Sequence, residues 1–290
     1  ISGGAATLSS ATPSSISSSG NVYTLGIGLS GTPSGGETLT VIPTDNGIYD
    51  AAGNEAYTSQ NNNTASLNDK LAPATSSVTI DADNMNVVIT MSEAVYNTNS
   101  GSGALQASDF ALSISGGTAT LSSVTPTSIS NSGNVYTLGI GLSGIANGSE
   151  TLTVLPVDNG IYDSVGNEAT TDQSNNTATL NDKLPPTISS TTIANDNSSV
   201  AVTFSELVYN TTGGSGALEV TDFTLSSTGG VASVAAAPSS ILIKSKVITL
   251  GLNITGVPDG SEKLLVVPSS ELQAINKLKA HILINVFILL

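Results

Sequence analysis

Apolar and polar residues alternate in several short stretches of the chain, a pattern typical of β-strands with one buried face. In "NVVITMS" (86–92), the apolar residues Val87, Ile89 and Met91 fall on one face, and "SVAVTFS" (199–205) alternates in the same way. No stretch before the last twenty residues has a convincing helical period. Short strands separated by "SGN", "NGS" and "DNG" turns predict an antiparallel all-β fold.

A glycine-containing strand is predicted within "VYTLGIGLSG" (135–144), and "TLTVLP" (151–156) ends on a proline, as a strand end or an edge strand would. The apolar face of the first stretch consists of Tyr136, Leu138, Ile140 and Leu142. Gly139 and Gly141 lie on the opposite face, where a missing side chain weakens a strand. These glycines indicate either a bulge or close packing of a neighbouring element, or else a flat Gly/Thr face used for binding.

Long phrases of the sequence occur twice. "DNGIYDAAGNEA" (45–56) returns as "DNGIYDSVGNEA" (158–169), at a spacing of 158 − 45 = 113 residues. "GNVYTLGIGLSG" occurs unchanged at 20–31 and 133–144, and weaker copies follow later in the chain. This period exceeds that of solenoid repeats and matches a complete sandwich domain of roughly 100 residues. Each repeat is therefore predicted to fold as a domain of its own.

Proline-containing pairs, "KLAP" (70–73) and "KLPP" (183–186), are the predicted boundaries between repeats. They predict the C-terminal part of one module at 1–70, a complete module at 71–183, and a third module at 184–290. The sequence thus predicts tandem antiparallel β-sandwiches, arranged as beads on a string. Because Ile1 falls in the middle of a repeat, we expect the chain to be a fragment.

Three phrases of the repeat are "VAVTFSELVYN" (200–210), the "DFTLS" that follows it, and the closing "IYDSVGNEA" of the preceding module. In these phrases, the repeat resembles bacterial immunoglobulin-like repeats. Such repeats occur in tandem in very large surface and secreted proteins, including giant cell-surface proteins of marine bacteria. The resemblance covers the second module in full and its neighbours in part. It implies immunoglobulin-like sandwiches, stacked in series, with a spacer or adhesive role and a secreted or cell-surface location. It does not imply an enzyme.

Charge and composition narrow the function classes. The chain has 22 acidic and 7 basic residues, a net charge of −15, which argues against nucleic acid and anionic membranes as partners and favours cations. There is no Cys and one His (His281), so a Ser or Thr nucleophile has no obvious base. Aromatic residues make up 4% of the chain, too few for a typical sugar-binding cleft. We therefore expect no enzyme.

Calcium is the cofactor that the acidic residues favour, because it prefers carboxylate and carbonyl oxygens on loops. Asp158 and Asp163 flank an Asn-Gly turn, Asp182 lies at a module junction, and the "SE" phrases contribute Glu93 and Glu206. The candidate metal ligands are Glu93, Asp158, Asp163, Asp182 and Glu206, with Asp45, Asp50 and Asp69 as equivalents in earlier copies.

A simpler interpretation of these acids remains open. Asn-Gly favours a type I′ hairpin turn, and Asp at the start of a turn can accept hydrogen bonds from its own backbone. The spacing of an EF-hand is not met. The carboxylates would then be structural or solvated.

The last twenty residues, "ELQAINKLKAHILINVFILL" from about 271, depart from the repeat. A frameshift or a degenerate sequence explains this departure; the start of a membrane anchor is the alternative. The apolar run "HILINVFILL" has 10 residues, short of the ~20 that a spanning helix needs, so we expect no direct membrane insertion. The third sandwich is expected to lack its last strand and to leave an open edge.

These observations predict a structural or adhesive repeat module, a stalk or spacer with neighbouring repeats as its contacts and calcium at the junctions. The rival hypothesis is a carbohydrate- or surface-binding module that contacts its ligand directly.

Overall fold

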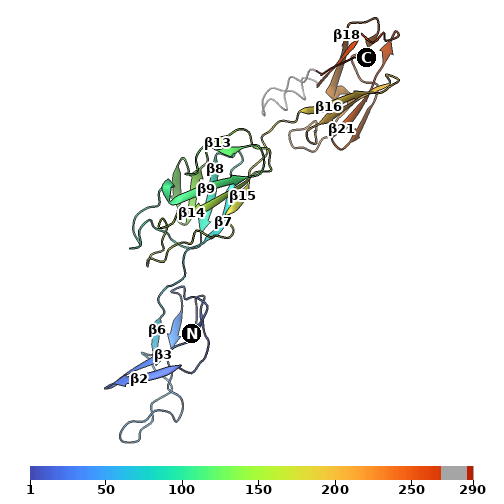
Figure 1. The fold of residues 1–290 in the computed structure, drawn as a ribbon. Helices are drawn as coiled ribbons and strands as arrows, with labels where there is room; N and C mark the ends of the chain where they lie inside the picture. Colours follow the sequence, from blue (N-terminus) through green and yellow to red (C-terminus); the bar gives the residue numbers. More distant parts are fainter. Residues whose placement is uncertain (269–285, 290) are drawn as a thin grey trace. The chain divides into compact units, whose positions relative to one another are not determined.

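The structure, a computed structural model, describes residues 1–268 and the backbone of residues 286–289. The chain divides into two compact units, Ile1–Asn181 and Asp182–Leu290. All strand pairs in the described residues are antiparallel, and two short 3-10 turns, η1 (Ala107–Asp109) and η2 (Val220–Asp222), are the helical elements there (Figure 1). The predicted all-β class is confirmed.

Residues 71–181 form two main sheets. One has the strand order β11-β12-β8-β7 and the other the order β15-β14-β9, with a small β10-β13 pair beside them. The strands are β7 (Thr75–Ile80), β8 (Asn86–Met91), β9 (Phe110–Ser115), β10 (Thr120–Leu121), β11 (Ile129–Ser132), β12 (Val135–Gly139), β13 (Leu142–Ser143), β14 (Thr151–Pro156) and β15 (Thr177–Thr179). The predicted strand at 86–92 is β8, and Pro156 ends β14 as expected, although β14 is the central strand of its sheet.

A single apolar core lies between these two sheets. Alternation places Val87 and Ile89 of β8 on the same buried face, each 0% exposed. Leu152 and Val154 of β14 belong to the same cluster, from the other sheet. Each such side chain stabilises the fold by about 1.5–3 kcal/mol relative to full exposure.

The two glycines of the "TLGIGL" stretch are explained by close packing. A Cβ at Gly139 would lie 2.4 Å from Thr127 Oγ1, and one at Gly141 would lie 2.4 Å from Ser122 Oγ. The segments that carry these hydroxyls press against the glycine face, so the prediction of close packing is confirmed. The same contact recurs at Gly26, where a Cβ would lie 2.4 Å from Ser15 Oγ.

The second unit repeats this topology, with sheets β16-β17-β21-β20 and β18-β23-β24 and a β19-β22 pair. A separate apolar cluster fills it. Its strands are β16 (Ile188–Ile193), β17 (Ser199–Phe204), β18 (Phe223–Thr228), β19 (Ser233–Val234), β20 (Ile241–Lys244), β21 (Val247–Gly251), β22 (Ile254–Thr255), β23 (Lys263–Pro268) and β24 (Val286–Leu289).

The expectation that the third repeat lacks its last strand was wrong. The backbone of β24 pairs with β23, with Leu264 opposite Ile288, as Leu152 pairs with Ala178 between β14 and β15. An unrelated sequence thus occupies the position of the last strand, because a strand ladder joins backbone groups and tolerates many side chains. The departure of the sequence from the repeat between 269 and 285, with the proposed frameshift, lies outside the described residues.

Residues 1–70 carry the same strands as the second half of the following module, in three two-stranded sheets: β1-β4, β2-β3 and β5-β6. In this fully described segment, Ala6 is the single buried apolar residue. The strands are β1 (Thr7–Leu8), β2 (Ser15–Ser19), β3 (Val22–Gly26), β4 (Leu29–Ser30), β5 (Thr38–Thr40) and β6 (Thr64–Ser66). The described residues contain no helix long and apolar enough to cross a membrane.

Candidate metal centre

The repeated "D-x-x-G-N" phrase is a loop that its own aspartate closes. Asp163 Oδ1 accepts hydrogen bonds from the backbone N–H groups of Val165 (2.9 Å) and Asn167 (2.8 Å), and Oδ2 accepts one from Asn167 Nδ2 (2.6 Å). The Asp163 side chain is fully buried. Asp50 closes the earlier copy of the loop in the same way. The phrase is therefore repeated first of all because it builds this turn.

The preceding "DNG" turn does not bring Asp158 to Asp163. Asn159 has a φ of 57°, whereas Gly160 is not in the left-handed region, so the turn is not the type I′ hairpin turn that Asn-Gly favours. Asp158 Oδ2 accepts a hydrogen bond from Asn159 Nδ2 at 2.9 Å, and Glu168 accepts one from the Asn159 backbone. The Asp158 carboxylate thus forms a hydrogen bond within its own turn.

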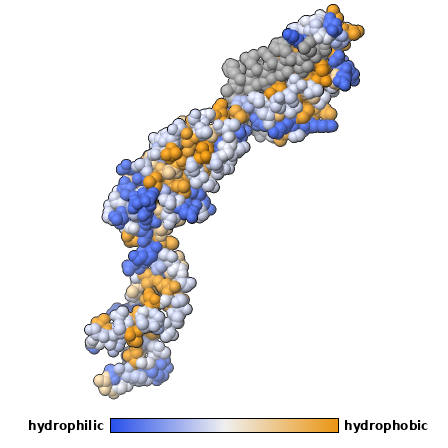
Figure 2. Space-filling model, viewed as in Figure 1, coloured by the Kyte–Doolittle hydropathy of each residue, from blue (hydrophilic) through white to orange (hydrophobic). Residues whose placement is uncertain are grey.

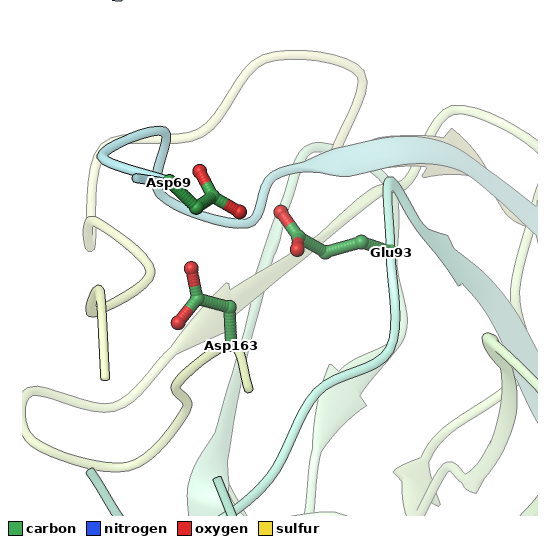
Figure 3. Close-up of side chains that lie close together, drawn as sticks. All are labelled: Asp69, Glu93 and Asp163. Carbon is green, nitrogen blue, oxygen red and sulfur yellow. The ribbon is translucent and has the colours of Figure 1, made fainter. Parts of the chain in front are cut away.

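Three carboxylates instead converge from distant parts of the sequence (Figure 3). Asp69 lies between β6 and β7, Glu93 follows β8, and Asp163 follows β14. One carboxylate oxygen from each lies within 4.8 Å of the other two. The structure therefore brings together two of the five principal candidates, Glu93 and Asp163, with Asp69, which the sequence indicated only as an equivalent of Asp182.

The chain on either side of Asp69 belongs to the first repeat. The backbone N–H of Lys70 donates to the Pro33 carbonyl at 2.9 Å, and Leu67 donates to the Glu37 carbonyl at 3.1 Å. Glu93 and Asp163 belong to the next repeat. The three carboxylates thus meet at the boundary between residues 1–70 and residues 71–181.

Gathering three carboxylates has an electrostatic cost. The pKa of Glu93 is raised above its usual value by burial and by the negative charges of Asp69 and Asp163. Asp69 Oδ1 accepts one hydrogen bond, from the Leu71 N–H at 2.9 Å. A cation between the three groups would remove their mutual repulsion.

The donor set matches a hard cation. Calcium takes six to eight oxygen ligands, and three carboxylates can supply three to six, with water and carbonyl groups completing the shell. Asp163 already accepts three hydrogen bonds, which leaves one of the about four lone-pair sites on its carboxylate. Asp69 and Glu93 would therefore be the principal ligands and Asp163 a third, monodentate one.

The remaining candidates are not part of this group. Asp45 Oδ2 accepts a hydrogen bond from Asn46 Nδ2, as Asp158 does from Asn159. In the second unit, Asp182 and Glu206 stand 113 residues after Asp69 and Glu93. The third repeat is one residue shorter before this point, since Glu262 follows Glu150 by 112 residues, so the position that corresponds to Asp163 is Ile275, which lies outside the described residues. The complete triad of acids thus occurs once in the sequence.

Comparisons with known proteins identify no family and one distant structural similarity. No family model matches the chain, and no curated protein is similar to it. The chain is similar to the N-terminal part of the bacterial S-layer protein SbsC, with 20% sequence identity and a TM-score of 0.29. The match covers 69% of this chain and 41% of that one, so it spans less than half of the S-layer fragment. A TM-score this low supports no conclusion about function.

The buried glutamate of each repeat is a feature that the sequence did not explain. Glu150 is 0% exposed, and its Oε1 accepts hydrogen bonds from the backbone N–H groups of Thr118 (2.7 Å), Ala119 (2.9 Å) and Asn147 (3.1 Å). Burial alone would raise its pKa, but these N–H groups outweigh burial and lower the pKa to about 2. Glu37 and Glu262 have the same surroundings, so this acid is structural in all three copies.

Glycine is required beside this carboxylate. A Cβ on Gly117, which has a φ of +61°, would lie 2.1 Å from the Cδ of Glu150. The sequence did contain a signal for this buried acid. Each repeat has a "GG" pair, as in "ISGG", and a Glu about 33 residues later.

Proposed function

We propose that this chain is a structural segment of a large secreted or cell-surface bacterial protein, in which tandem immunoglobulin-like modules act as a stalk or spacer. The repeated topology supports this proposal: the same two-sheet arrangement, with a core of its own, occurs in residues 71–181 and again in the second unit. The resemblance to bacterial immunoglobulin-like repeats points in the same direction. Catalysis is not part of the proposal.

We further propose that calcium binds at Asp69, Glu93 and Asp163 and fixes the junction between two repeats. The observation that carries this step is the convergence of three carboxylates, from both sides of the boundary, within 4.8 Å. Because Asp69 belongs to the end of the first repeat and the other two acids belong to the following module, a bound ion would restrain the chain between them. Such restraint suits a spacer, whose reach depends on stiff connections between modules.

The test is thermal unfolding of the full chain in calcium and in chelator. We expect a melting temperature that rises with calcium and saturates, since a ligand bound only by the native state stabilises it, by about 2.7 kcal/mol at a concentration of 100 Kd. Asp69→Asn and Glu93→Gln should each abolish most of the gain. Asp158→Asn is the matched control: it removes an exposed acid of the same repeat that lies outside the triad and should leave the gain intact.

The outcomes separate the two parts of the proposal. Identical melting curves with calcium and chelator would eliminate the metal site and leave a passive spacer. An equal loss of response in Asp158→Asn would show that net charge, rather than this site, binds the ion. Micromolar binding to an array of glycans would instead favour the rival hypothesis, a module that contacts a carbohydrate ligand directly.

A further inference from the structure

The first and last strands of residues 71–181 lie side by side, although they belong to different sheets (Figure 1). β7 (Thr75–Ile80) is an edge strand of one sheet, and β15 (Thr177–Thr179) is an edge strand of the other. The chain thus enters this module through β7 and leaves it through β15. In a stalk, tension along the chain would reach the module through these two strands.

Side-chain hydrogen bonds join the two strands near both of their ends. At the start of β7, the backbone N–H of Thr75 donates to Gln173 Oε1 at 2.7 Å. Beyond the other end of β7, Asn84 Nδ2 donates to the Asn181 carbonyl at 2.7 Å, and Asn84 Oδ1 accepts a hydrogen bond from the Asn181 backbone N–H at 2.8 Å. Asn181 Nδ2 also donates to the Asp81 carbonyl at 2.9 Å.

Asn84 is held in the position that this contact needs. It is 3% exposed, and its φ of 63° lies in the left-handed region, which Asn adopts more readily than most residues. Asn84 Oδ1 also accepts a hydrogen bond from Asn181 Nδ2 at 3.0 Å, so both polar atoms of the buried carboxamide bind Asn181. A buried amide that loses its partners destabilises the fold, so the two residues stay paired while the module is folded.

These contacts show that β7 and β15 run in the same direction. Gln173, the partner of Thr75, precedes β15, and Asn181, the partner of Asn84, follows it. The chain therefore enters at one end of the strand pair and leaves at the other. Tension would pull the two strands in opposite directions along their length, which loads them in shear. Under shear, the ladder hydrogen bonds of β7 with β8 and of β15 with β14 must break together with the carboxamide bonds, whereas peeling breaks them one at a time.

The outer side of this strand pair is polar. β7 and β15 expose hydroxyl groups there, from Ser77, Thr79, Thr177 and Thr179. Figure 2 shows polar as well as apolar atoms on the visible face of this module. On the outer side, the two strands are therefore joined by hydrogen bonds rather than by apolar contacts.

We propose that β7 and β15, joined by Gln173 and by the Asn84–Asn181 pair, form a clamp that bears tension along the chain. The proposal rests on the proposed function, a stalk or spacer, and adds a load-bearing function to it. A spacer that unfolds under tension would lengthen and lose its stiffness. The clamp would keep the length of the module constant, because it places the strands that receive the load in shear.

The first experiment varies the direction of pulling in single-molecule force spectroscopy. The chain has no Cys, so pairs of cysteine substitutions can attach handles at chosen positions of the full chain. Lys70→Cys with Lys183→Cys loads the clamp in shear, whereas Asp83→Cys with Lys183→Cys applies force at the Asn181 end and peels the strands apart. We expect residues 71–181 to unfold at a clearly higher force in the first geometry, measured in chelator so that no cation at the carboxylate triad contributes. Equal forces in the two geometries would overturn the proposal.

The second experiment removes the bonds of the clamp in the shear geometry. Asn84→Ala deletes three hydrogen bonds, and we expect it to raise the rate of unfolding at a fixed force roughly tenfold or more. Gln173→Ala deletes the one bond to Thr75 and should raise the rate less. Thr118→Val is the control: it deletes a 2.7 Å hydrogen bond to the Ile145 carbonyl, which joins the segments before β10 and after β13, and should leave the rate nearly unchanged. An equal rise in the control would contradict a special role of the terminal strands.

The two experiments also separate the clamp from the function on which it rests. The comparison of pulling directions changes nothing at Asn84, so it decides the question even if Asn84→Ala fails to fold. Low unfolding forces in both directions would remove the clamp and leave a spacer that carries no load. Direct binding of a glycan would argue against the spacer and would not alter the forces measured here.

Discussion

At the scale of single residues, the buried glutamate shows how one charged side chain can organise a repeat. The Glu150 carboxylate accepts hydrogen bonds from two separate segments, Thr118–Ala119 and Asn147. The Ala119 N–H is buried, and leaving it without a partner would cost about 1–3 kcal/mol. The carboxylate thus joins the loop after β9 to the loop before β14.

Replacement of Glu150 by Gln tests this role. The amide has nearly the same shape, but it loses the charge and turns a donor toward the N–H groups, so we expect the first unit to lose about 1–3 kcal/mol of stability. Chemical denaturation of the full chain measures this loss. Asp172→Asn, the same charge change at an exposed position, should change stability by less than about 0.5 kcal/mol. Equal effects of the two substitutions would refute a structural role for the pocket.

The sequence predicted correctly which side chains of a strand are buried, because this depends on neighbouring residues. It did not predict which acids meet in space, because this depends on residues far apart in the sequence. The alternation of Val87, Ile89 and Met91 fixes which face is buried, and all three are buried. The meeting of Asp69 with Glu93 and Asp163 depends on the packing of loops 24 and 94 positions apart in the sequence. No local pattern encodes that distance. Asp158 and Asp163 stayed apart for the opposite reason: each is held by hydrogen bonds within its own turn.

At the scale of strands, backbone pairing tolerated a change of sequence that the repeat pattern did not anticipate. The back strand β15 reads TAT, whereas β24 in the corresponding position reads VFIL. A comparison of sequences indicates that the repeat is lost here, because such a comparison depends on the identity of the side chains. The sheet retains the strand, because its ladder is formed by N–H and C=O groups that every residue except proline has in full.

Deletion of residues 286–290 tests the contribution of β24. Without it, the β23 backbone loses the strand that pairs with its Lys263–Val266 portion, and we expect the second unit to unfold at a lower temperature and to self-associate through the exposed edge. The first unit should melt unchanged, which makes it an internal control within the same molecule. Calorimetry and sedimentation together measure both effects. An unchanged second transition would mean that β24 contributes no stability in solution.

At the scale of the whole molecule, each of the three repeats contains a buried glutamate whose protonation should destabilise the fold. Glu37, Glu150 and Glu262 each have a pKa lowered to about 2, against 4.5 without the fold. A carboxyl whose pKa is lower in the folded state stabilises the fold fully above its unfolded pKa and loses that effect as the pH falls toward the folded pKa. The loss should therefore occur between about pH 4.5 and pH 2 in every repeat.

Glu93 has the opposite sign, which makes the pH profile a test of two features at once. Its raised pKa means that the fold favours the protonated form, so its ionised form destabilises the chain near neutral pH and the penalty disappears as the pH falls. Melting temperature measured in chelator should therefore rise slightly as the pH falls from neutral toward the ordinary pKa of a glutamate, and it should fall at lower pH as the three buried glutamates become protonated. Glu93→Gln should remove the rise and Glu150→Gln should reduce the fall in the first unit. A calcium ion at the triad should flatten the rise as well, since it cancels the repulsion that protonation would otherwise relieve; a rise that persists in saturating calcium would contradict binding at these three carboxylates.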